Sequence, residues 1–459
     1  MMRLHSCALG LAMVLGSLAV QAAEPQVVAK LTIPLPAESR LHYQGPFASA
    51  FGAGLPLGLG SGLFFDGQDA DGTLHFVSLT DRGPNGDAPQ WHGKQESKIF
   101  LRPDFTPQWR PLQVKDGQVS VGAAVLLHDG QGVLHGLPLP AGTVGATGEQ
   151  AIDAALQPVA VPDSRGLDSE GIVADGRGGY WLCDEYGPFL IHVDGQGKVL
   201  QKYGPEAQGG SKAVASGLPA VLAWRQPNRG FEGIARLPSG KIIAAVQSTL
   251  DIEGKTAKQA SFIRLLELDP ASGQTRMLAY PLEAGFYKKN KDAKLGDLVA
   301  VDETTLLAIE QGKDKDKQMH NRIYRLDLAA ASDLSALRVE GKEPEFASAA
   351  ALAAAGMRPV GKQLLVDLQA LGWQAEKAEG LALIDARTLA ISNDNDFGVA
   401  VKVTQPVAQS KDITDYSTEG DGKLRYDGQP VASRVQLQPL DAAESASLLW
   451  LIQLPQALR

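Results

Sequence analysis

Cysteine is nearly absent from this sequence of 459 residues, which contains only two. Cys7 lies in an N-terminal apolar stretch, so the rest of the chain has Cys183 alone and cannot contain an internal disulfide. Cys183 ends the strand-like run Tyr180-Trp181-Leu182-Cys183, where no neighbouring side chain would activate a thiolate. We therefore expect Cys183 to be a packed core residue rather than a nucleophile.

Basic clusters and long apolar runs are also lacking. The chain has 43 Lys and Arg against 52 Asp and Glu, which gives a formal net charge of −9. Nucleic acids and anionic membrane surfaces are therefore poor partners. No segment beyond the N terminus is apolar enough for a membrane span. A bound cation could offset part of the negative charge, and the oligomeric state is left open.

The N terminus has the pattern of a signal peptide. Arg3 precedes an apolar run at residues 7–20, which is shorter than the ~20 residues of a membrane-spanning helix. Val20 and Ala22 are the small residues that cleavage after Ala22 requires at positions −3 and −1. We predict a signal peptide of residues 1–22 and a periplasmic or secreted domain of residues 23–459. An uncleaved anchor or a buried N-terminal helix is the alternative.

Glycine, by contrast, is abundant, with 50 residues, and it marks an internal repeat. In the repeat an acidic residue precedes a glycine and a short apolar run. One copy inverts the acid and the glycine, and another lacks the acid. The copies start at Glu170-Gly171, Glu232-Gly233, Glu379-Gly380, the inverted Gly296-Asp297 and the acid-free Ser61-Gly62.

Each copy is followed by a turn and a second apolar run, and most of these runs end in a polar cluster. Short apolar runs between Gly and Asp turns are typical of antiparallel strands. Because both the acid-glycine start and the polar end recur, the pattern favours a β-propeller over a β-sandwich with unrelated turns. We predict an all-β fold with a single β-propeller. Six blades are favoured, and five or seven are left open, because residues 62–170 are long enough for two blades.

Two further features of the propeller follow from the sequence. Residues 27–34 are expected to pair beside residues 448–454, which would close the ring and remove a free strand edge. Short helical insertions are expected at the Ala-rich residues 347–355 and at residues 362–371.

Propeller geometry would bring acidic residues of several blades to one central mouth. The first strand of each blade starts on the face to which the second strand returns. Converging carboxylates raise one another's pKa unless a cation lies between them, and oxygen ligands suit Ca²⁺. Histidine is absent from the acidic clusters, which disfavours zinc. The predicted Ca²⁺ ligands are Glu170, Asp184, Glu185, Glu232, Glu310, Glu379, Asp394 and Asp396.

Basic and polar residues stand beside these acids. They could bind a phosphate or carboxylate group of a substrate, or they could pair with the neighbouring acids as part of the structure. The predicted substrate-binding residues are Arg82, Arg165, Asn228, Arg229 and Tyr186.

Six segments combine acidic residues with a turn or the start of a strand. They are Asp81-Arg82-Gly83-Pro84-Asn85, Ser169-Glu170-Gly171-Ile172, Asp184-Glu185-Tyr186-Gly187, Asn228-Arg229-Gly230-Phe231-Glu232-Gly233, Ala378-Glu379-Gly380-Leu381 and Asn393-Asp394-Asn395-Asp396-Phe397. Taken in order, they resemble the phytase-like family of exported bacterial proteins, which is named for the esterase-like activity of phytase. The resemblance covers roughly residues 55–454, and it implies a β-propeller whose acidic residues take part in phosphoester hydrolysis. The inverted and acid-free copies depart from the repeat and reduce the number of expected ligands.

Three functions are consistent with this pattern. The first is metal-assisted hydrolysis of a small phosphorylated substrate, with Glu170, Glu232 and Asp81 as the catalytic residues. The second is a non-catalytic periplasmic binding or scaffold propeller that holds a structural Ca²⁺. The third is a lactonase-type hydrolase, which the lack of a histidine pair near the mouth disfavours. A serine esterase lacks support because the chain has no Gly-x-Ser-x-Gly motif.

Overall fold

A computed structural model describes residues 24–35, 37–208, 210–408 and 410–458, and shows an all-β protein. The predicted signal peptide of residues 1–22 lies outside these residues. Among the described residues, no helix is long and apolar enough to cross a membrane. The only α-helix there is α1 (Ala349–Ala354). The short 3-10 helices are η1 (Ala37–Ser39), η2 (Ala48–Phe51), η3 (Ala220–Trp224), η4 (Ile252–Gly254), η5 (Asn290–Asp292), η6 (Pro344–Phe346), η7 (Asp396–Gly398) and η8 (Ile413–Asp415).

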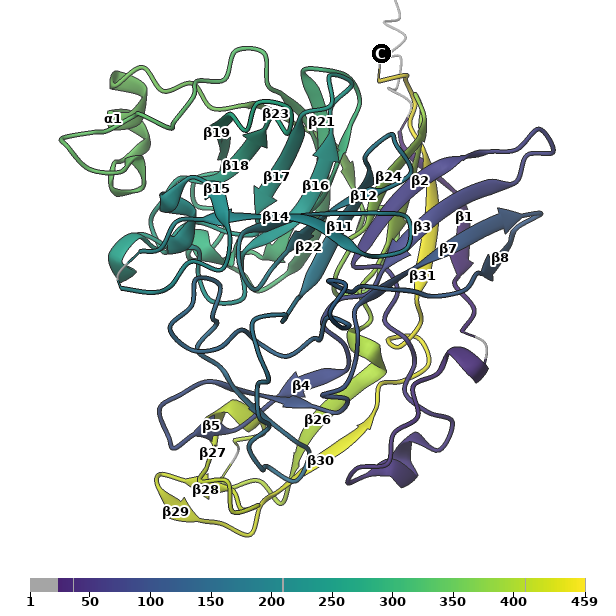
Figure 1. The fold of residues 1–459 in the computed structure, drawn as a ribbon, viewed down its shortest axis with the longest axis vertical. Helices are drawn as coiled ribbons and strands as arrows, with labels where there is room; N and C mark the ends of the chain where they lie inside the picture. Colours follow the sequence, from purple (N-terminus) through teal and green to yellow (C-terminus); the bar gives the residue numbers. More distant parts are fainter. Residues whose placement is uncertain (1–23, 36, 209, 409, 459) are drawn as a thin grey trace, which may run out of the picture.

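Five sheets of four or five strands make up most of the described fold, and the repeat supplies the first strand of each (Figure 1). The first sheet contains β2 (Gly62–Gln68), β3 (Leu74–Leu79), β7 (Gln108–Lys115), β8 (Gln118–Val121) and β9 (Val125–Leu126). The second contains β11 (Ser169–Ala174), β12 (Tyr180–Asp184), β13 (Phe189–Val193), β14 (Val199–Pro205) and β15 (Ser216–Leu218). The third contains β16 (Phe231–Arg236), β17 (Ile242–Val246), β18 (Phe262–Leu268) and β19 (Thr275–Pro281).

The fourth and fifth sheets complete this set. The fourth contains β20 (Lys294–Ala300), β21 (Thr305–Lys313), β22 (Met319–Asp327) and β23 (Gly361–Asp367). The fifth contains β24 (Leu381–Asp385), β25 (Thr388–Ser392), β31 (Leu448–Gln453) and β1 (Gln26–Thr32). In the fifth sheet β1 pairs antiparallel with β31, from Gln26 opposite Gln453 to Thr32 opposite Leu448. The predicted pairing of the two ends of the chain is therefore confirmed.

The first strands of the five sheets contact one another in turn: β2 lies against β11, β11 against β16, β16 against β20, β20 against β24, and β24 against β2. Glycine permits this close approach. A Cβ atom on Gly233 would lie only 2.4 Å from the carbonyl oxygen of Gly296 in the next sheet. Such a distance is shorter than any ordinary carbon–oxygen contact, so the glycine of the repeat is needed for packing between sheets.

Asp297 occupies the place of that glycine in the inverted copy, and it ties the first strands together. One carboxylate oxygen accepts hydrogen bonds from the backbone N–H groups of Leu298 and Ile234, at 2.8 and 3.3 Å. The other accepts from Leu381 and Leu63, at 3.2 and 3.5 Å. These donors lie in the fourth, third, fifth and first sheets, so one buried side chain joins four of the five.

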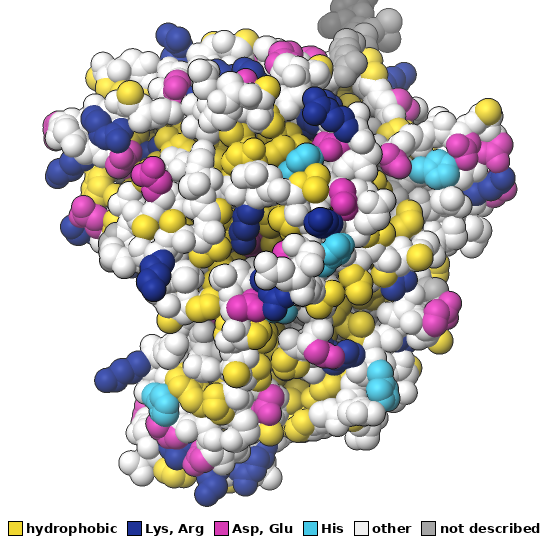
Figure 2. Space-filling view, in the orientation of Figure 1, with side chains coloured by type: hydrophobic (Ala, Val, Ile, Leu, Met, Phe, Trp, Pro, Cys, Tyr) yellow, Lys and Arg dark blue, Asp and Glu magenta, His cyan; other side chains and the backbone are white. Residues whose placement is uncertain are grey.

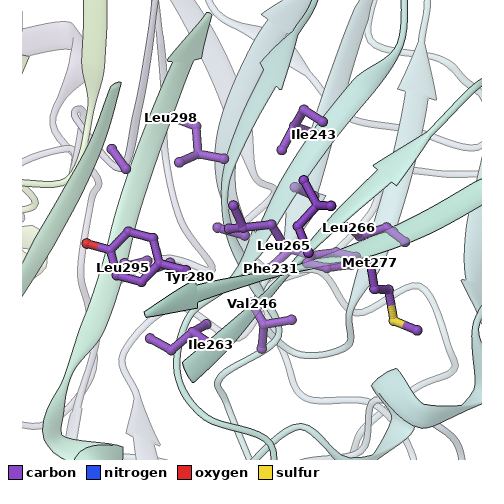
Figure 3. Close-up of a cluster of buried hydrophobic side chains, with 14 of the residues drawn as sticks. Phe231, Ile243, Val246, Ile263, Leu265, Leu266, Met277, Tyr280, Leu295 and Leu298 are labelled. Carbon is purple, nitrogen blue, oxygen red and sulfur yellow. The ribbon is translucent and has the colours of Figure 1, made fainter. Parts of the chain in front are cut away.

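The hydrophobic core lies within and between the sheets. Figure 3 shows side chains of the third sheet, among them Ile243 and Leu265, packed together with Leu295 and Leu298 of β20. Cys183 is fully buried in the same cluster and forms no disulfide. It is a packed core residue, as expected.

Three smaller sheets form what we call the insertion lobe, at the lower end of Figure 1. Its strands come from the loops that leave the first, second and fifth sheets at the ends where their first strands begin. The sheets contain β4 (Asn85–Asp87), β6 (Ser97–Phe100) and β10 (Gln150–Ile152); β26 (Val399–Thr404) and β30 (Arg434–Pro439); and β5 (Gln90–Trp91), β27 (Ser417–Thr418), β28 (Arg425–Tyr426) and β29 (Gln429–Pro430).

Of the two helical insertions expected from the sequence, one is confirmed and the other is wrong. The Ala-rich segment forms α1, which Ser348 caps by accepting a hydrogen bond from the N–H of Ala351. The helix expected at residues 362–371 is wrong, because residues 361–367 form β23, the outer strand of the fourth sheet. Residues 62–170 supply the first sheet and part of the insertion lobe.

Replacement of Asp297 tests its role in joining the sheets. We expect Asp297→Ala to lower the free energy of unfolding by about 3 kcal/mol or more, because buried N–H groups would lose their acceptor. Urea unfolding followed by circular dichroism measures this change. Asp316→Ala, at an exposed loop, is the control and should change it by less than about 0.5 kcal/mol. Equal stability of both variants would contradict the role assigned to Asp297.

Candidate functional site

Three glutamates that precede or begin first strands meet at the end of the sheets that faces the insertion lobe. Glu170 and Glu232 lie in β11 and β16, and Glu379 lies two residues before β24. One carboxylate oxygen of each lies within 4.8 Å of the others, and the three residues are only 3–6% exposed. We call these residues the strand group. Their convergence follows from the repeat, since each occupies the same position in its own sheet.

A second cluster shares Glu170 with the strand group. Carboxylate oxygens of Asp81, Asp168 and Glu170 also lie within 4.8 Å of one another, and we call these residues the loop group. Asp81 follows β3 and Asp168 immediately precedes β11. Asp168 was not among the site residues expected from the sequence. Its position two residues before Glu170 was the available signal, because residues i and i+2 of an extended chain point to the same side.

Arg82 lies at the edge of the loop group and orients it. Its backbone N–H donates to one oxygen of Asp168 at 3.0 Å, and its Nε lies 3.5 Å from the other. Its guanidinium also lies 3.7 Å from a carboxylate oxygen of Glu149 and donates a hydrogen bond to Asn228. Arg82 is 7% exposed, so a cation is permanently held beside these acids.

Two glutamine side chains donate hydrogen bonds to the clustered acids. The amide nitrogen of Gln247 donates to both Glu185 and Glu232, at 2.6 and 2.9 Å. The amide nitrogen of Gln311 donates to Glu379 at 3.5 Å. The amide oxygens of both glutamines are buried and have no hydrogen-bond partner. These two amide oxygens accept no hydrogen bond from the described residues and lie beside clustered carboxylates. Together, the amide and carboxylate oxygens form a set of ligands that fits a hard cation.

In the Asp184-Glu185-Tyr186 segment, Glu185 lies in the site, and the other two residues hold the surrounding loops in place. Glu185 faces the site and accepts hydrogen bonds from Asn228 and Gln247. Asp184 accepts instead from the backbone N–H groups of Asp168 and Tyr186, which fixes the loop behind Glu185. The hydroxyl group of Tyr186 is buried and donates to the carbonyl of Gly136, while its ring lies 5.5 Å from the Arg82 guanidinium.

Lys377 neutralises part of the acidic cluster on the side of the fifth sheet. Its ammonium group lies 2.5 Å from Asp394, 2.9 Å from Asp396 and 3.9 Å from Glu379. The Asp396 side chain is 54% exposed, whereas that of Asp394 is 5% exposed. Asp394 therefore belongs to the buried site, while Asp396 lies at its rim.

Three residues expected at the site lie elsewhere or serve another purpose. Glu310 points away from the strand group and contacts Lys362 and two tyrosine hydroxyls. Its neighbour Gln311 takes the inward place, because successive residues of a strand point to opposite faces. Arg165 pairs with Asp163 through two nitrogens, at 2.7 and 2.9 Å, outside both groups. Arg229 donates to the backbone carbonyl of Lys291.

Burial and mutual repulsion raise the pKa of the clustered carboxyl groups. Burial, followed by repulsion from Glu232, holds the pKa of Glu170 well above its usual range. The pKa of Glu232 is also raised well above its usual range, by burial and then by repulsion from Glu185. Burial is the largest cause for Glu185 and Glu379, whose pKa values rise to about 8 and about 7. Protons or cations are thus needed to balance these charges near neutral pH.

The face of the molecule seen in Figure 2 carries charges of both signs. Figure 2 shows charged side chains of both signs scattered over the visible face, with no large patch of one sign. The carboxyl groups of the strand and loop groups, by contrast, are buried, since none of these residues is more than 7% exposed.

Together, the fold and the site define an all-β protein with a buried acidic centre, and a comparison with known families identifies its relatives. The chain belongs to the Phytase-like family, described as "Esterase-like activity of phytase", which matches residues 56–397. The family expected from the sequence is thereby confirmed. The matched region contains every residue of the strand and loop groups.

One curated relative and several solved structures are also similar to the chain. An uncharacterized secreted protein of Arthroderma benhamiae is 31% identical over 128 residues, which cover 24% of this chain and 25% of that protein. The chain therefore matches about a quarter of that relative's length.

Similarity to solved structures is weak. A protein of unknown function from Dyadobacter fermentans is 9% identical, with a TM-score of 0.29 over 85% of this chain and 76% of that one. An α-L-arabinofuranosidase from Podospora anserina is 7% identical, with a TM-score of 0.32 over 95% of this chain and 99% of that one. These scores are too low to establish a common fold.

The raised pKa values predict how cations change stability with pH. Without a cation, the folded protein retains protons that the unfolded chain loses above about pH 4.3, so stability falls as the pH rises through about 7–8. A cation that displaces these protons should raise Tm more at pH 8 than at pH 5. Thermal unfolding with Ca²⁺ or with a chelator, across this range, measures the difference. An identical Tm in both conditions at every pH would contradict cation binding at these carboxyl groups.

Proposed function

We propose that this chain is an exported hydrolase of phosphoesters that acts at a cation-binding centre formed by the strand and loop groups. The observation that carries the proposal is the convergence of five buried carboxyl groups beside a buried arginine, in a member of the Phytase-like family. The residues are Asp81, Asp168, Glu170, Glu232 and Glu379, with Arg82.

We further propose that the five large sheets are the blades of one β-propeller. The successive contacts of their first strands, which return from β24 to β2, support this arrangement. The pairing of β1 with β31 supports closure of the ring within the fifth sheet. We favour five blades over the six expected from the sequence, because residues 62–170 supply one large sheet and part of the insertion lobe.

Export is supported by two independent features. Residues 1–22 have the sequence pattern of a signal peptide. The similar protein of Arthroderma benhamiae is described as secreted. Periplasmic and extracellular destinations both agree with these features.

The donor set supports a hard divalent cation such as Ca²⁺. The strand and loop groups, together with the amide oxygens of Gln247 and Gln311, would hold it through oxygen atoms alone. When bound, such a cation polarises a phosphoryl oxygen and lowers the pKa of a coordinated water.

The chain's own residues would bind the substrate and move protons. Arg82 would bind the anionic phosphoryl group through its guanidinium. Glu232 would accept a proton from the attacking water, whose oxygen forms the new bond to phosphorus as the ester P–O bond breaks. Glu185, with its pKa raised to about 8, would donate a proton to the departing oxygen. Gln247 donates to both glutamates and would keep them adjacent.

The second candidate function is a non-catalytic, cation-stabilised binding or scaffold protein. It is favoured by the depth of the site, since no member of the strand or loop group is more than 7% exposed. A lactonase activity has less support, because no hydrogen bond or ion pair joins a described histidine to either group.

An assay of phosphoester hydrolysis separates the first two functions. We expect the purified protein to hydrolyse phosphomonoesters or phosphodiesters with Ca²⁺ and to lose this activity in a chelator. Glu232→Gln should lower kcat at least 100-fold, because it removes a proposed cation ligand as well as the general base, and general-base catalysis alone contributes about 10²–10⁴-fold. Glu376→Gln, whose side chain is 67% exposed in a surface ion pair, is the control and should retain full activity. If no ester is hydrolysed although Ca²⁺ still stabilises the protein, the non-catalytic function is correct.

Arg82 lies beside the loop group and Arg165 lies outside both groups, so replacing each of them tests which one binds the substrate. We expect Arg82→Gln to raise KM for a phosphoester at least tenfold, because the buried guanidinium would no longer bind the anion. Arg165→Gln should leave KM unchanged, since Arg165 pairs with Asp163 outside both groups. Steady-state kinetics of the two variants measures this difference. A larger effect from Arg165 would contradict the assignment of Arg82.

A further inference from the structure

Glu170 belongs to both three-carboxyl clusters, and it is their only shared member. Its carboxylate lies within 4.8 Å of Asp81 and Asp168 in the loop group, and within the same distance of Glu232 and Glu379 in the strand group. A carboxylate has two oxygens and about four lone-pair directions, so it can serve two cations at once.

The surroundings of Glu170 set it apart from the other four carboxylates. Asp81 and Asp168 accept hydrogen bonds from backbone N–H groups, while Glu232 and Glu379 accept from glutamine amides. No hydrogen bond or ion pair joins the Glu170 side chain to any residue in the described part of the chain, although it is only 6% exposed. A carboxylate that is mostly buried, has no described protein partner and lies at the junction of two clusters is available to bind a ligand.

Charge gives a second argument for more than one cation. The two groups together contain five carboxylates, against which the chain places Arg82 and Lys377. Glu185 and Asp394 also lie in this centre, so seven carboxylates stand against these two cationic side chains. When all seven are ionised, one divalent cation would leave a net charge of about −3 and two would leave about −1. The orphaned amide oxygens of Gln247 and Gln311, beside the strand group, offer further uncharged ligands.

We propose that Glu170 bridges two divalent cations, one held by the loop group and one by the strand group. This inference rests on the cation binding proposed above and adds its stoichiometry and bridging ligand. The Asp81, Asp168 and Glu170 oxygens bind the first cation, and the Glu170, Glu232 and Glu379 oxygens bind the second. An all-oxygen donor set suits Ca²⁺, Mg²⁺ or Mn²⁺. A phosphoester, whose several phosphoryl oxygens can contact both cations, is the class of substrate that such a pair fits.

The stoichiometry of cation binding tests the bridge without any substrate. Calorimetric titration of the chelator-treated protein with Ca²⁺, and metal analysis after loading with Mn²⁺, should each give two equivalents per chain. Asp168→Asn should retain only the cation of the strand group, and Glu232→Gln only that of the loop group. Glu170→Gln should weaken binding at both positions at least tenfold. Glu376→Gln is the control and should still bind two.

Two results would overturn the proposal. One is a single equivalent bound by the unaltered protein. The other is loss of the same single cation in both the Asp168 and the Glu232 variants. Circular dichroism establishes that each variant is folded, and Asp81→Asn replaces Asp168→Asn if loss of the Arg82 contact prevents folding. Two equivalents without hydrolysis would support the bridge and refute the proposed enzyme, whereas hydrolysis with one equivalent would do the reverse.

Discussion

The repulsion between buried carboxyl groups is the constraint on which the site depends. Their common origin in the repeat brings Glu170, Glu232 and Glu379 to one place, and the close packing of the first strands keeps them there. Lys377 and Arg82 offset only part of this charge. The remainder must be balanced by protons, which the raised pKa values express, or by cations, which the unpartnered oxygens fit.

Asp297 shows that the protein has another way to bury a carboxylate. Four backbone N–H groups donate to its two oxygens, so it is satisfied by the fold itself. Glu170 lies one position earlier in its own copy of the repeat, and no backbone N–H group of the described residues donates a hydrogen bond to its side chain. The inverted copy therefore gives its carboxylate four backbone donors, whereas, in the described chain, the copy at Glu170 gives its carboxylate none. This contrast supports a structural role for Asp297 and the cation binding that we propose for Glu170.

The repeat made much of the architecture predictable from the sequence. Acid-glycine starts and polar ends located the first two strands of the sheets, and the apolar ends of the chain indicated the pairing of β1 with β31. The structure of residues 62–170 could not be predicted, because a long segment between two copies of the repeat can form either another large sheet or an insertion. The strand β23 was mistaken for a helix since a short apolar run is ambiguous in isolation.

The sequence predicted which strand starts bring acids together, but it did not predict which way each neighbouring side chain points. The positions of Glu170, Glu232 and Glu379 follow directly from the repeat. A shift of one residue decides whether a side chain faces the site, which is why Gln311 is present and Glu310 is not. Asp168 and Glu149 were missed because they precede strands in loops that show no repeat. Arg165 was placed by sequence proximity alone, and its local pair with Asp163 was not visible in the repeat.

Anomalous diffraction from crystals grown with Mn²⁺ would show whether the converging carboxylates form a cation-binding centre. We expect anomalous density between the carboxylates of Glu170, Glu232 and Glu379, and a second peak between Glu170, Asp81 and Asp168. Crystals in which these side chains keep their positions while no anomalous density appears among them would contradict this expectation.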